Sequence, residues 1–334
     1  MKVVILFDDV ASRPTATPDE MGVLEAVTAV ETGLRAHAHE TVRVPAGVNL
    51  ARWSYLLRTA EPDLVFNLCE GLGGRSDGEV LASRVVEEMG LPMTGSPSSV
   101  LALARRKDQV NRLLESRRLP VPPWGLWNGF SRDSWAAEWG VFPAIVKPAA
   151  EDGSVGITQD SVVFDRESLA RRMWEVGEFA PLLVQAFVGA REINVGIVGD
   201  QVLPLSEILF SDLPAGHHPI VGYEAKWSPG SPEDRGTVPV CPAPLPKPLA
   251  ERIGALAMQA WEAVGGEGYG RVDFRFTEPD TLHVLEVNPN PDLAPSAGLA
   301  RMAVAAGWAY SDLLGQIVSE ALSTAAAGAR GGEL

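Results

Sequence analysis

A predicted β-hairpin near the end of the chain, residues 271–290, carries side chains that could bind a metal ion. Apolar and polar residues alternate on both sides of a turn-rich Thr-Glu-Pro-Asp-Thr segment, a pattern that predicts two paired strands. A loop of two residues and a loop of four give the same pairing, in which Asp273 faces Glu286 and Arg271 faces Asn288. All four side chains then lie on one face of the sheet, because side chains alternate along a strand.

Opposed carboxylates on paired strands repel each other unless positive charge lies between them. Carboxylate and amide oxygens are ligands that Mg²⁺ prefers, so Asp273, Glu286 and Asn288 are candidate metal ligands. Arg271 beside them could stabilise a developing anion or a phosphoryl group. Taken alone, such a set is more typical of an edge hairpin whose acids face solvent, and the features below favour the metal site.

The first 95 residues alternate predicted strands and helices, which favours a small doubly wound α/β domain. The predicted strands are 2–7, 41–44 and 62–68, and the predicted helices are 19–38 and 50–59. A loop with four glycines, residues 69–79, follows the third strand and contains Glu70. Loops at strand ends often hold substrate groups, although a plain surface loop would have the same composition.

The middle of the chain begins with a predicted basic helix at 100–118 and a Pro-rich extended segment at 120–125. A strand at 142–147 ends at Pro148, since proline interrupts the ladder. The following Gly153-Ser154-Val155-Gly156 could cradle phosphates with backbone N–H groups, or it could be an ordinary hairpin turn. It is not a Walker A loop, because it lacks the Gly-Lys-Ser/Thr ending.

The last third contains predicted strands at 182–188, 193–197 and 201–205 and predicted helices at 248–264 and 308–323. Residues 211–247 are rich in Pro, Gly and charge, and a connection of that length is usually a functional lid or a disordered linker. We expect residues 211–240 to form a mobile lid that brings Lys226 to the site. The small, polar residues 325–334 predict a disordered tail.

The net charge of −15 and the pI near 4.8 argue against nucleic acid as the main partner, which would need a basic surface. Cys69 and Cys241 are the two cysteines, so no disulfide framework is predicted and a reducing, cytoplasmic setting is expected. The apolar run at the N-terminus is too short for a signal peptide. No membrane span is expected, since no run of about 18 apolar residues occurs.

An ordered series of motifs runs through the chain from about residue 60 to residue 323. The series is Phe66-Asn67-Leu68, Thr94-Gly95-Ser96, Lys107, Phe142-Pro-Ala-Ile-Val-Lys147-Pro148, Gly153 to Gly156, Glu192, Tyr223-Glu-Ala-Lys226, Gly270-Arg271-Val-Asp273 and Leu285-Glu286-Val-Asn288. In this order the motifs resemble the ATP-grasp fold and, within it, the D-alanine–D-alanine ligase family. The resemblance implies an N-terminal doubly wound α/β domain at 1–96 and two α+β subdomains that clasp ATP, at 97–188 and 189–324.

The resemblance implies an ATP-dependent carboxylate–amine ligase. In such enzymes ATP phosphorylates a carboxylate, and an amine attacks the acyl phosphate to form a peptide or amide bond with release of ADP and phosphate. The expected partners are amino acids, amines or a small peptide, and a homodimer is possible. The alternative is a nucleotide-binding regulatory or partner-binding protein without turnover. A nicotinamide-binding Rossmann protein is excluded, since no Gly-x-Gly-x-x-Gly follows the first strand.

The resemblance also assigns roles to single residues. For the nucleotide these are Lys107 and Lys147 on the phosphates, Gly153, Ser154, Val155 and Gly156 closing over them, Gln185, Ala186 and Val188 at the adenine, and Glu192 at the ribose. Asp273, Glu286 and Asn288 would hold two Mg²⁺ or Mn²⁺ ions. Lys226 and Arg271 would stabilise the transferring phosphoryl group and the oxyanion.

The substrate pockets depart from the family pattern. The family's acid for the first substrate's amine is not visible in residues 7–20, and Gly153 and Trp227 replace a serine and a tyrosine that it would contact. Glu70 and Ser296 remain candidate substrate residues, the latter an approximate match to a serine that holds the second carboxylate. Asp292 stands where the family has an oxyanion-hole glycine. It is expected to face the acceptor, the alternative being that it faces solvent or pairs with an arginine such as Arg301.

Overall fold

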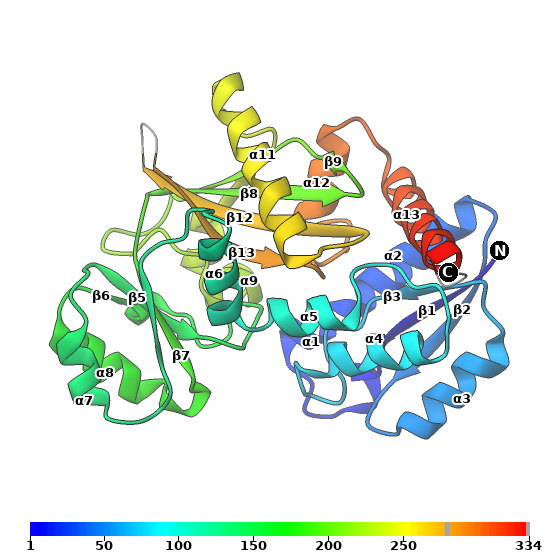
Figure 1. Ribbon diagram of the computed structural model, residues 1–334, viewed down its shortest axis with the longest axis horizontal. Coiled ribbons are helices and arrows are strands. Elements are labelled where there is room, and N and C mark those ends of the chain that lie inside the picture. Colours follow the sequence, from blue (N-terminus) through cyan, green and yellow to red (C-terminus); the bar gives the residue numbers. More distant parts are fainter. Residues whose placement is uncertain (278–280, 332–334) are drawn as a thin grey trace.

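The computed structural model describes residues 1–277 and 281–331, and within these residues the strands form three sheets (Figure 1). The first is a parallel sheet in the order β2-β1-β3. The side chains of Val3 to Leu6 in its middle strand are fully buried, as expected for a parallel strand covered on both faces. The elements of this part are β1 (Lys2–Asp8), α1 (Pro18–Met21), α2 (Val23–Ala36), β2 (Glu40–Ala46), α3 (Leu50–Ala60), β3 (Leu64–Asn67) and α4 (Gly78–Glu88).

The second sheet is antiparallel, in the order β4-β7-β5-β6. Its strands and helices are β4 (Trp124–Trp127), α7 (Arg132–Glu138), β5 (Ala144–Pro148), β6 (Val162–Val163), α8 (Arg166–Glu175) and β7 (Leu182–Ala186). Leu169 and Met173 of α8 pack on Val146 and Val184 in the core of this part. The sheet therefore holds the loop after β5 in a fixed place.

The third sheet has the order β11-β10-β8-β12-β13, with β9 paired to β8. Its elements are β8 (Arg191–Val198), β9 (Gln201–Val202), β10 (Ser206–Leu209), β11 (Val238–Val240), α11 (Lys247–Val264), β12 (Tyr269–Thr277) and β13 (Thr281–Asn288). Helix α11 lies against this sheet (Figure 1), and its Ile253, Ala257 and Trp261 belong to one core with Val272 and Val287. The other face of β12 is left for polar side chains.

The predicted pairing of Arg271 with Asn288 and of Asp273 with Glu286 is confirmed. The pairing near the turn differs, because Thr277 pairs with Thr281, and the three loop residues between them, 278–280, lie outside the described residues. A β-bulge after Asp273 absorbs the difference, since Phe274 pairs with Val284 and Leu285 is the extra residue on β13. Without this bulge Asp273 would face Leu285, so the bulge sets the position of Glu286.

The basic segment 100–118 forms two helices, α5 (Ser98–Ala104) and α6 (Lys107–Ser116), so the prediction of one helix is wrong. The backbone turns at Arg106, and the N–H of Lys107 donates to the carbonyl of Ala149, 3.0 Å away, instead of to a helical partner. This break directs Arg105 and Lys107 toward the loop after β5.

In three other segments the structure contains helices that the sequence did not predict. The segment 211–240 contains the short helices α9 (Tyr223–Trp227) and α10 (Pro232–Gly236) as well as β11. Helix α12 (Gly298–Ala305) was not predicted, and α13 (Tyr310–Gly331) continues past residue 324, where a disordered tail was expected. Alanine is the best helix former, which explains why the Ala-rich stretch extends this helix. Residues 332–334 lie outside the described residues.

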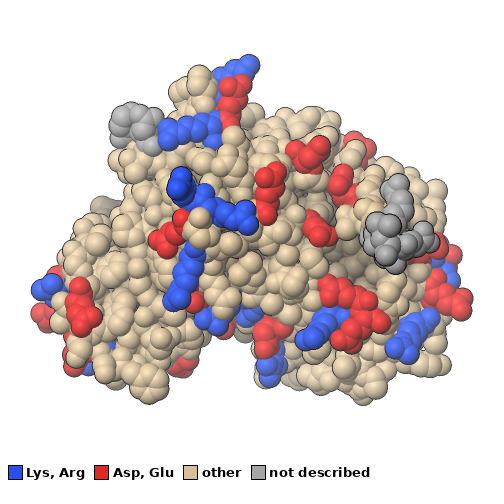
Figure 2. All heavy atoms as spheres, in the orientation of Figure 1, with Lys and Arg blue, Asp and Glu red and all other residues tan. Residues whose placement is uncertain are grey.

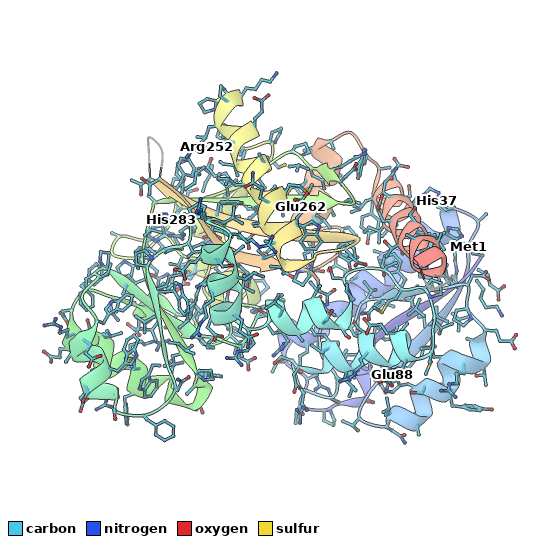
Figure 3. The ribbon with its side chains drawn as sticks, in the orientation of Figure 1. Met1, His37, Glu88, Arg252, Glu262 and His283 are labelled. Carbon is cyan, nitrogen blue, oxygen red and sulfur yellow. The ribbon has the colours of Figure 1, made fainter. Side chains whose placement is uncertain are left out.

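The last two helices return to the first sheet and share a core with it. Leu299 of α12 and Leu314 of α13 belong to the same buried cluster as Ile5 and Phe66. Nε2 of His37, at the end of α2, lies 2.8 Å from the carbonyl of Ser311 (Figure 3). Within the described ranges, each helix is too short or too polar to cross a bilayer. On the face shown in Figure 2, acidic and basic side chains are interspersed.

Candidate active site

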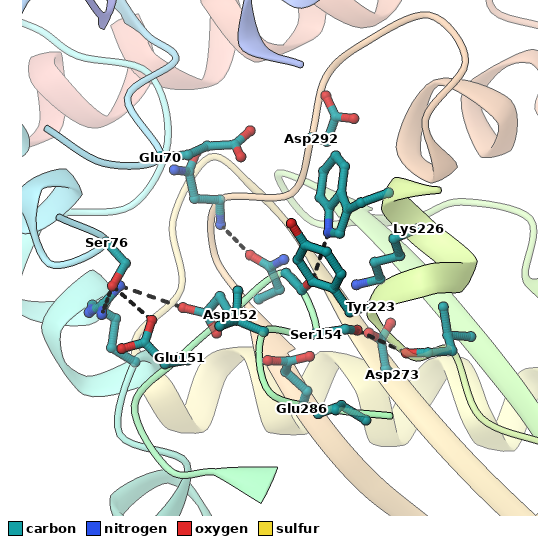
Figure 4. A pocket seen from close by; sticks show the side chains of 18 of the residues that line it. Glu70, Ser76, Glu151, Asp152, Ser154, Tyr223, Lys226, Asp273, Glu286 and Asp292 are labelled. Atoms are coloured by element: carbon teal, nitrogen blue, oxygen red, sulfur yellow. Dashed lines mark hydrogen bonds and ion pairs between the residues drawn. The ribbon is translucent and has the colours of Figure 1, made fainter. Parts of the chain in front are cut away.

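A cavity of about 2240 Å³ lies where elements of all three sheets meet. Most of the predicted site residues line it, and Figure 4 shows Asp273 and Glu286 on one side with Glu70 and Asp292 on the other. The predicted residues on its wall are Glu70, Lys147, Gly153, Ser154, Val155, Gly156, Gln185, Ala186, Val188, Glu192, Lys226, Arg271, Asp273, Glu286, Asn288, Asp292 and Ser296. Lys107 is not on the wall and is buried behind it.

Asp273 is held by protein donors on both of its oxygens. Arg271 makes a two-pronged ion pair with it, with Nε 2.7 Å from Oδ1 and Nη2 2.9 Å from Oδ2. Nδ2 of Asn194, on the adjacent strand β8, donates to Oδ1 at 2.8 Å. The guanidinium of Arg271 therefore supplies positive charge beside the opposed acids in this structure, without a metal ion.

Lys107 has three oxygen partners, which uses all three donors of its ammonium group. Its Nζ lies 2.5 Å from the Glu151 carbonyl, 2.8 Å from Oδ1 of Asp152 and 3.3 Å from Oε1 of Glu286. Although burial opposes it, the charges of Glu286 and Asp152 hold the pKa of Lys107 above its usual value. Glu286 has a pKa well below its usual range despite its burial, because Lys107 and other cations surround it.

Two further lysines reach the cavity without an ion pair of their own among the described residues. The pKa of Lys147 is lowered to about 8, first by burial and then by the charges of Lys107 and Arg275, against the attraction of Glu286. The pKa of Lys226, on α9, is also lowered, first by burial and then by Arg271. These cations are held close together before any anion binds, which makes this end of the cavity a place for phosphate groups.

The donor set at β12 and β13 fits a hard divalent cation. Glu286 stays ionised at neutral pH, and among the described residues Oδ1 of Asn288 accepts one hydrogen bond, from the N–H of Asn290 at 2.8 Å. Asp273 would share its oxygens between Arg271 and such a cation. No cluster of three or more His, Cys, Asp or Glu placed to hold a metal occurs within the part of the chain that the structure describes.

The loop after β5 has the backbone of a tight, left-handed turn. Gly153, Ser154 and Gly156 have φ of 62°, 62° and 74°, and a Cβ on Gly156 would lie 2.9 Å from Cγ of Pro148. The loop is tied to the segment around α9: Oγ of Ser154 donates to the Val221 carbonyl at 2.8 Å, and Nε1 of Trp227 donates to the Gly153 carbonyl at 2.8 Å. Gly153 and Trp227, the two positions that depart from the family pattern, thus contact each other through the bond from the indole N–H to the Gly153 carbonyl.

Glu192 faces a residue that the sequence analysis missed, Arg275. The two are cross-strand partners on β8 and β12, with Nη2 of Arg275 3.0 Å from Oε2 of Glu192. Arg275 also donates to the carbonyls of Gly189 and Pro219, and its guanidinium lies 5.1 Å from the Phe187 ring centroid. Alternation along β12 places it on the face of Arg271 and Asp273, and that signal could have identified it.

Gln185 is 1% exposed, and its Nε2 has no hydrogen-bond partner among the described residues. A buried amide without a partner is costly, so a bound group that accepts a hydrogen bond would stabilise this end of the cavity. The carboxamide sits on β7, and Ile145, Phe187 and Val188 line the cavity with it. These apolar and amide groups suit a flat heteroaromatic ring.

The opposite end of the cavity carries the predicted substrate residues and several acids. Asp292 accepts the N–H of Ala294 at 2.7 Å. Arg301 donates to the Ser296 carbonyl at 2.9 Å, and no ion pair of Arg301 with Asp292 occurs among the described residues. Arg13, which also lines this end, is paired with Glu20 at 2.6 Å. This end of the cavity wall therefore carries both acidic and basic side chains.

Comparisons with known proteins identify the family. The model of the D-ala D-ala ligase C-terminus matches residues 114–319. A D-alanine–D-alanine ligase of Gluconobacter oxydans (strain 621H) is 32% identical over 97% of this chain and 100% of its own length. A second one, of Caulobacter sp. (strain K31), is 34% identical over 86% of this chain and 84% of its own length.

A solved structure shows the same fold. The crystal structure of D-alanine–D-alanine ligase from Bacillus anthracis complexed with ATP superposes with a TM-score of 0.76 at 20% identity. The superposition covers 98% of this chain and 99% of that one. The predicted ATP-grasp fold is thus confirmed. The chain belongs to the D-alanine–D-alanine ligase family and is an ATP-dependent ligase that forms carbon–nitrogen bonds.

Proposed function

We propose that this ligase joins two small amino-acid substrates, D-alanine among them, through an acyl phosphate. The observation that carries the proposal is the gathering of Lys147, Lys226 and Arg271 at one wall of a single cavity, beside Glu286. The relatives' name supports D-alanine as a substrate. A protein that only binds a nucleotide has no use for the second, mixed-charge end of the cavity, so the regulatory alternative is not favoured.

We assign the nucleotide to the end of the cavity that Gln185, Glu192 and Lys147 line. Gln185 with Ala186 and Val188 would contact the adenine, Glu192 the ribose, and the loop from Gly153 to Gly156 with Lys107 and Lys147 the phosphates. Lys107 can do so only if a phosphate oxygen replaces one of its present partners. This exchange supports a role for the loop after β5 in closing over the nucleotide.

Asp273, Glu286 and Asn288 would hold Mg²⁺, which when bound supplies positive charge to the phosphates and lowers the cost of transfer. Arg271 would leave one oxygen of Asp273 and stabilise the oxyanion that forms when the amine attacks. Lys226, on α9 at the cavity wall, would contact the transferring phosphoryl group. The division into units at 1–96, 97–188 and 189–324 agrees with one sheet in each range and remains our proposal.

We place the substrates between Glu70, Asp292 and Ser296. A carboxylate at position 292 would repel an acceptor's own carboxylate, unless Arg301 on the same wall offsets it. The amine of an acceptor would be attracted to the same acid. An acceptor whose carboxylate is blocked is therefore expected to react at least as well as D-alanine.

The test is phosphate release on mixing the protein with Mg-ATP and either D-alanine or D-alanine amide, with the product identified by mass. Release that depends on an amino acid, and a dipeptide or dipeptide amide product, are expected. Glu286→Gln should abolish release, since it removes a cation ligand and the partner of Lys107, and full activity in that variant contradicts the metal assignment. No release with any amino acid or amide tested contradicts the proposed function.

A further inference from the structure

Glu79, in the first turn of α4, is a buried acid to which the roles above assign nothing. The residue is 7% exposed and lines the cavity. Each of its two oxygens has its own partner: Nδ2 of Asn290 donates to Oε2 at 3.2 Å, and Nη1 of Arg105 lies 3.6 Å from Oε1. A carboxylate faces both donors with an oxygen, whereas an amide in the same place would turn an oxygen to one of them and an NH₂ to the other.

The contact with Asn290 reaches a proposed cation ligand. Nδ2 of Asn290 also donates to the Cys69 carbonyl at 3.0 Å, so this side chain fastens the residues after β13 to the loop after β3. The backbone N–H of Asn290 donates to Oδ1 of Asn288 at 2.8 Å. Because a backbone N–H can only donate, this bond fixes which end of the Asn288 amide is the oxygen.

The contact with Arg105 reaches the loop after β5. Nη2 of Arg105 donates to Oγ of Ser76 at 2.8 Å and to the Ala150 carbonyl at 2.9 Å, and Nη1 lies 3.7 Å from Asp152. Asp152 in turn pairs with Lys107, which pairs with Glu286. These contacts link Asn288 to Glu79 and link Glu79 to Glu286. Glu286 and Asn288 are themselves two residues apart on β13.

Because these residues are buried, the network of contacts is sensitive to the loss of any one of them. Glu79, Arg105 and Lys107 are each less than a tenth exposed, and a buried donor that loses its acceptor destabilises the structure around it. Burial and the charge of Asp152 raise the pKa of Glu79 to about 7, and the bonds from Asn290 and Arg105 oppose that rise. The two donors therefore help to keep the carboxylate ionised.

We propose that Glu79 is a positioning residue for the ligase reaction, which holds the Asn288 amide and Arg105 in place and so aligns the cation ligands of β13 with the loop after β5. It acts through Asn290 and Arg105 and touches no reacting group. The inference rests on the proposed role of Asn288 and Glu286 as cation ligands. Loss of residues that orient metal ligands typically costs about 10- to 100-fold in metal affinity or activity.

Glu79→Gln tests this, because it leaves one of the two donors facing an amide NH₂. The Mg²⁺ concentration that half-saturates ATP binding, measured without acceptor, should rise about tenfold or more. Amide exchange at residues 149–156 and 288–292 of the ligand-free protein should become faster. Glu87→Gln is the matched control: it makes the same charge change on α4 and removes a bond to Ser98, at the other end of the helix. It should alter neither measurement.

A second pair of variants separates positioning from general loss of stability. Asn290→Asp sets a carboxylate against Glu79 and should be worse than Glu79→Gln. Combining the two changes lets the glutamine amide at position 79 donate to the carboxylate at position 290 while its oxygen accepts from Arg105. The double variant should recover Mg²⁺ affinity at least about tenfold over Asn290→Asp alone.

Unchanged Mg²⁺ affinity and exchange in Glu79→Gln would overturn the proposal. If that variant does not fold, the double variant decides, and a double variant no better than Asn290→Asp overturns it too. Both readouts are independent of turnover. A protein that binds Mg-ATP as expected and yet releases no phosphate therefore counts against the proposed substrates and leaves the role of Glu79 standing.

Discussion

At the scale of single residues, the cavity concentrates cations that have little solvation. The titration of Lys147 falls in a pH range where binding can be measured, because burial and the neighbouring charges of Lys107 and Arg275 bring its pKa to about 8. A lysine with that pKa is mostly charged at pH 7 and mostly neutral at pH 9. Its contribution to phosphate binding in the free protein should therefore be lost as the pH rises through 8.

We expect ATP binding to weaken above pH 8, by up to about tenfold per pH unit for loss of one proton. Titration of the dissociation constant between pH 6.5 and 9.5 measures this. Lys147→Arg keeps its charge throughout and should flatten the profile. Lys247→Arg, on the exposed start of α11, is the control and should leave it unchanged. A wild-type profile that is flat from pH 7 to 9 contradicts the assignment.

The sequence predicted which residues form this site. It did not predict all of the ion pairs that balance their charges. Asp273, Glu286 and Arg271 were placed correctly on one face, but the ion pair of Glu286 with Lys107 comes from geometry that the spacing does not encode. Lys107 reaches Glu286 only because α5 and α6 are separate helices. Asn290 and Arg105 were missed for the same reason, since their contacts join segments far apart in sequence.

At the scale of elements, β13 shows how a correct pairing can arise from a different local structure. The buried residues of β13 are Leu282, Val284 and Val287, so the two-residue alternation of buried positions shifts by one after Val284. The bulge at Leu285 causes this shift. Adjacent apolar residues at 284 and 285 were the signal of that change. The strands and most helices were predictable because their apolar periods are long, whereas α9 and α10 are single turns whose stability comes from contacts.

The segment around α9 stays predicted to be a mobile lid. Hydrogen bonds of Ser154, Trp227 and Tyr223 join it to the loop after β5, and these bonds connect two loops and not a core. Limited proteolysis should cut residues 211–240 in the free protein and cut them more slowly with Mg²⁺ and a non-hydrolysable ATP analogue.

Trp227→Phe should speed cleavage of the free protein, because it removes the donor to the Gly153 carbonyl and keeps most of the ring. Trp139→Phe removes a similar bond, to the Val141 carbonyl, in the connection between α7 and β5 and serves as the control. Equal cleavage of the segment with and without nucleotide would show that it does not close.

At the scale of the molecule, the two ends of the chain form one core. Helices α12 and α13 pack with β1, β3 and α2, and a Cβ on Gly33 would lie 2.4 Å from Cδ1 of Leu314. The periodicity of residues 308–323 predicted a helix without indicating where it packs. The loop that carries Asp292 is therefore held between the third sheet and a core built on the first one, and the cavity depends on both.

Leu314→Ala tests this shared core. The side chain is fully buried, so its truncation should cost about 2–5 kcal/mol of unfolding free energy in urea. If β1 to β3 and α13 unfold together, fluorescence and far-UV circular dichroism should show one coincident transition that shifts as a whole. Val304→Ala, at a position on α12 that is 63% exposed, should change stability by less than about 0.5 kcal/mol. Two separate transitions, of which the mutation moves only one, would mean that the last helices are a separate folding unit.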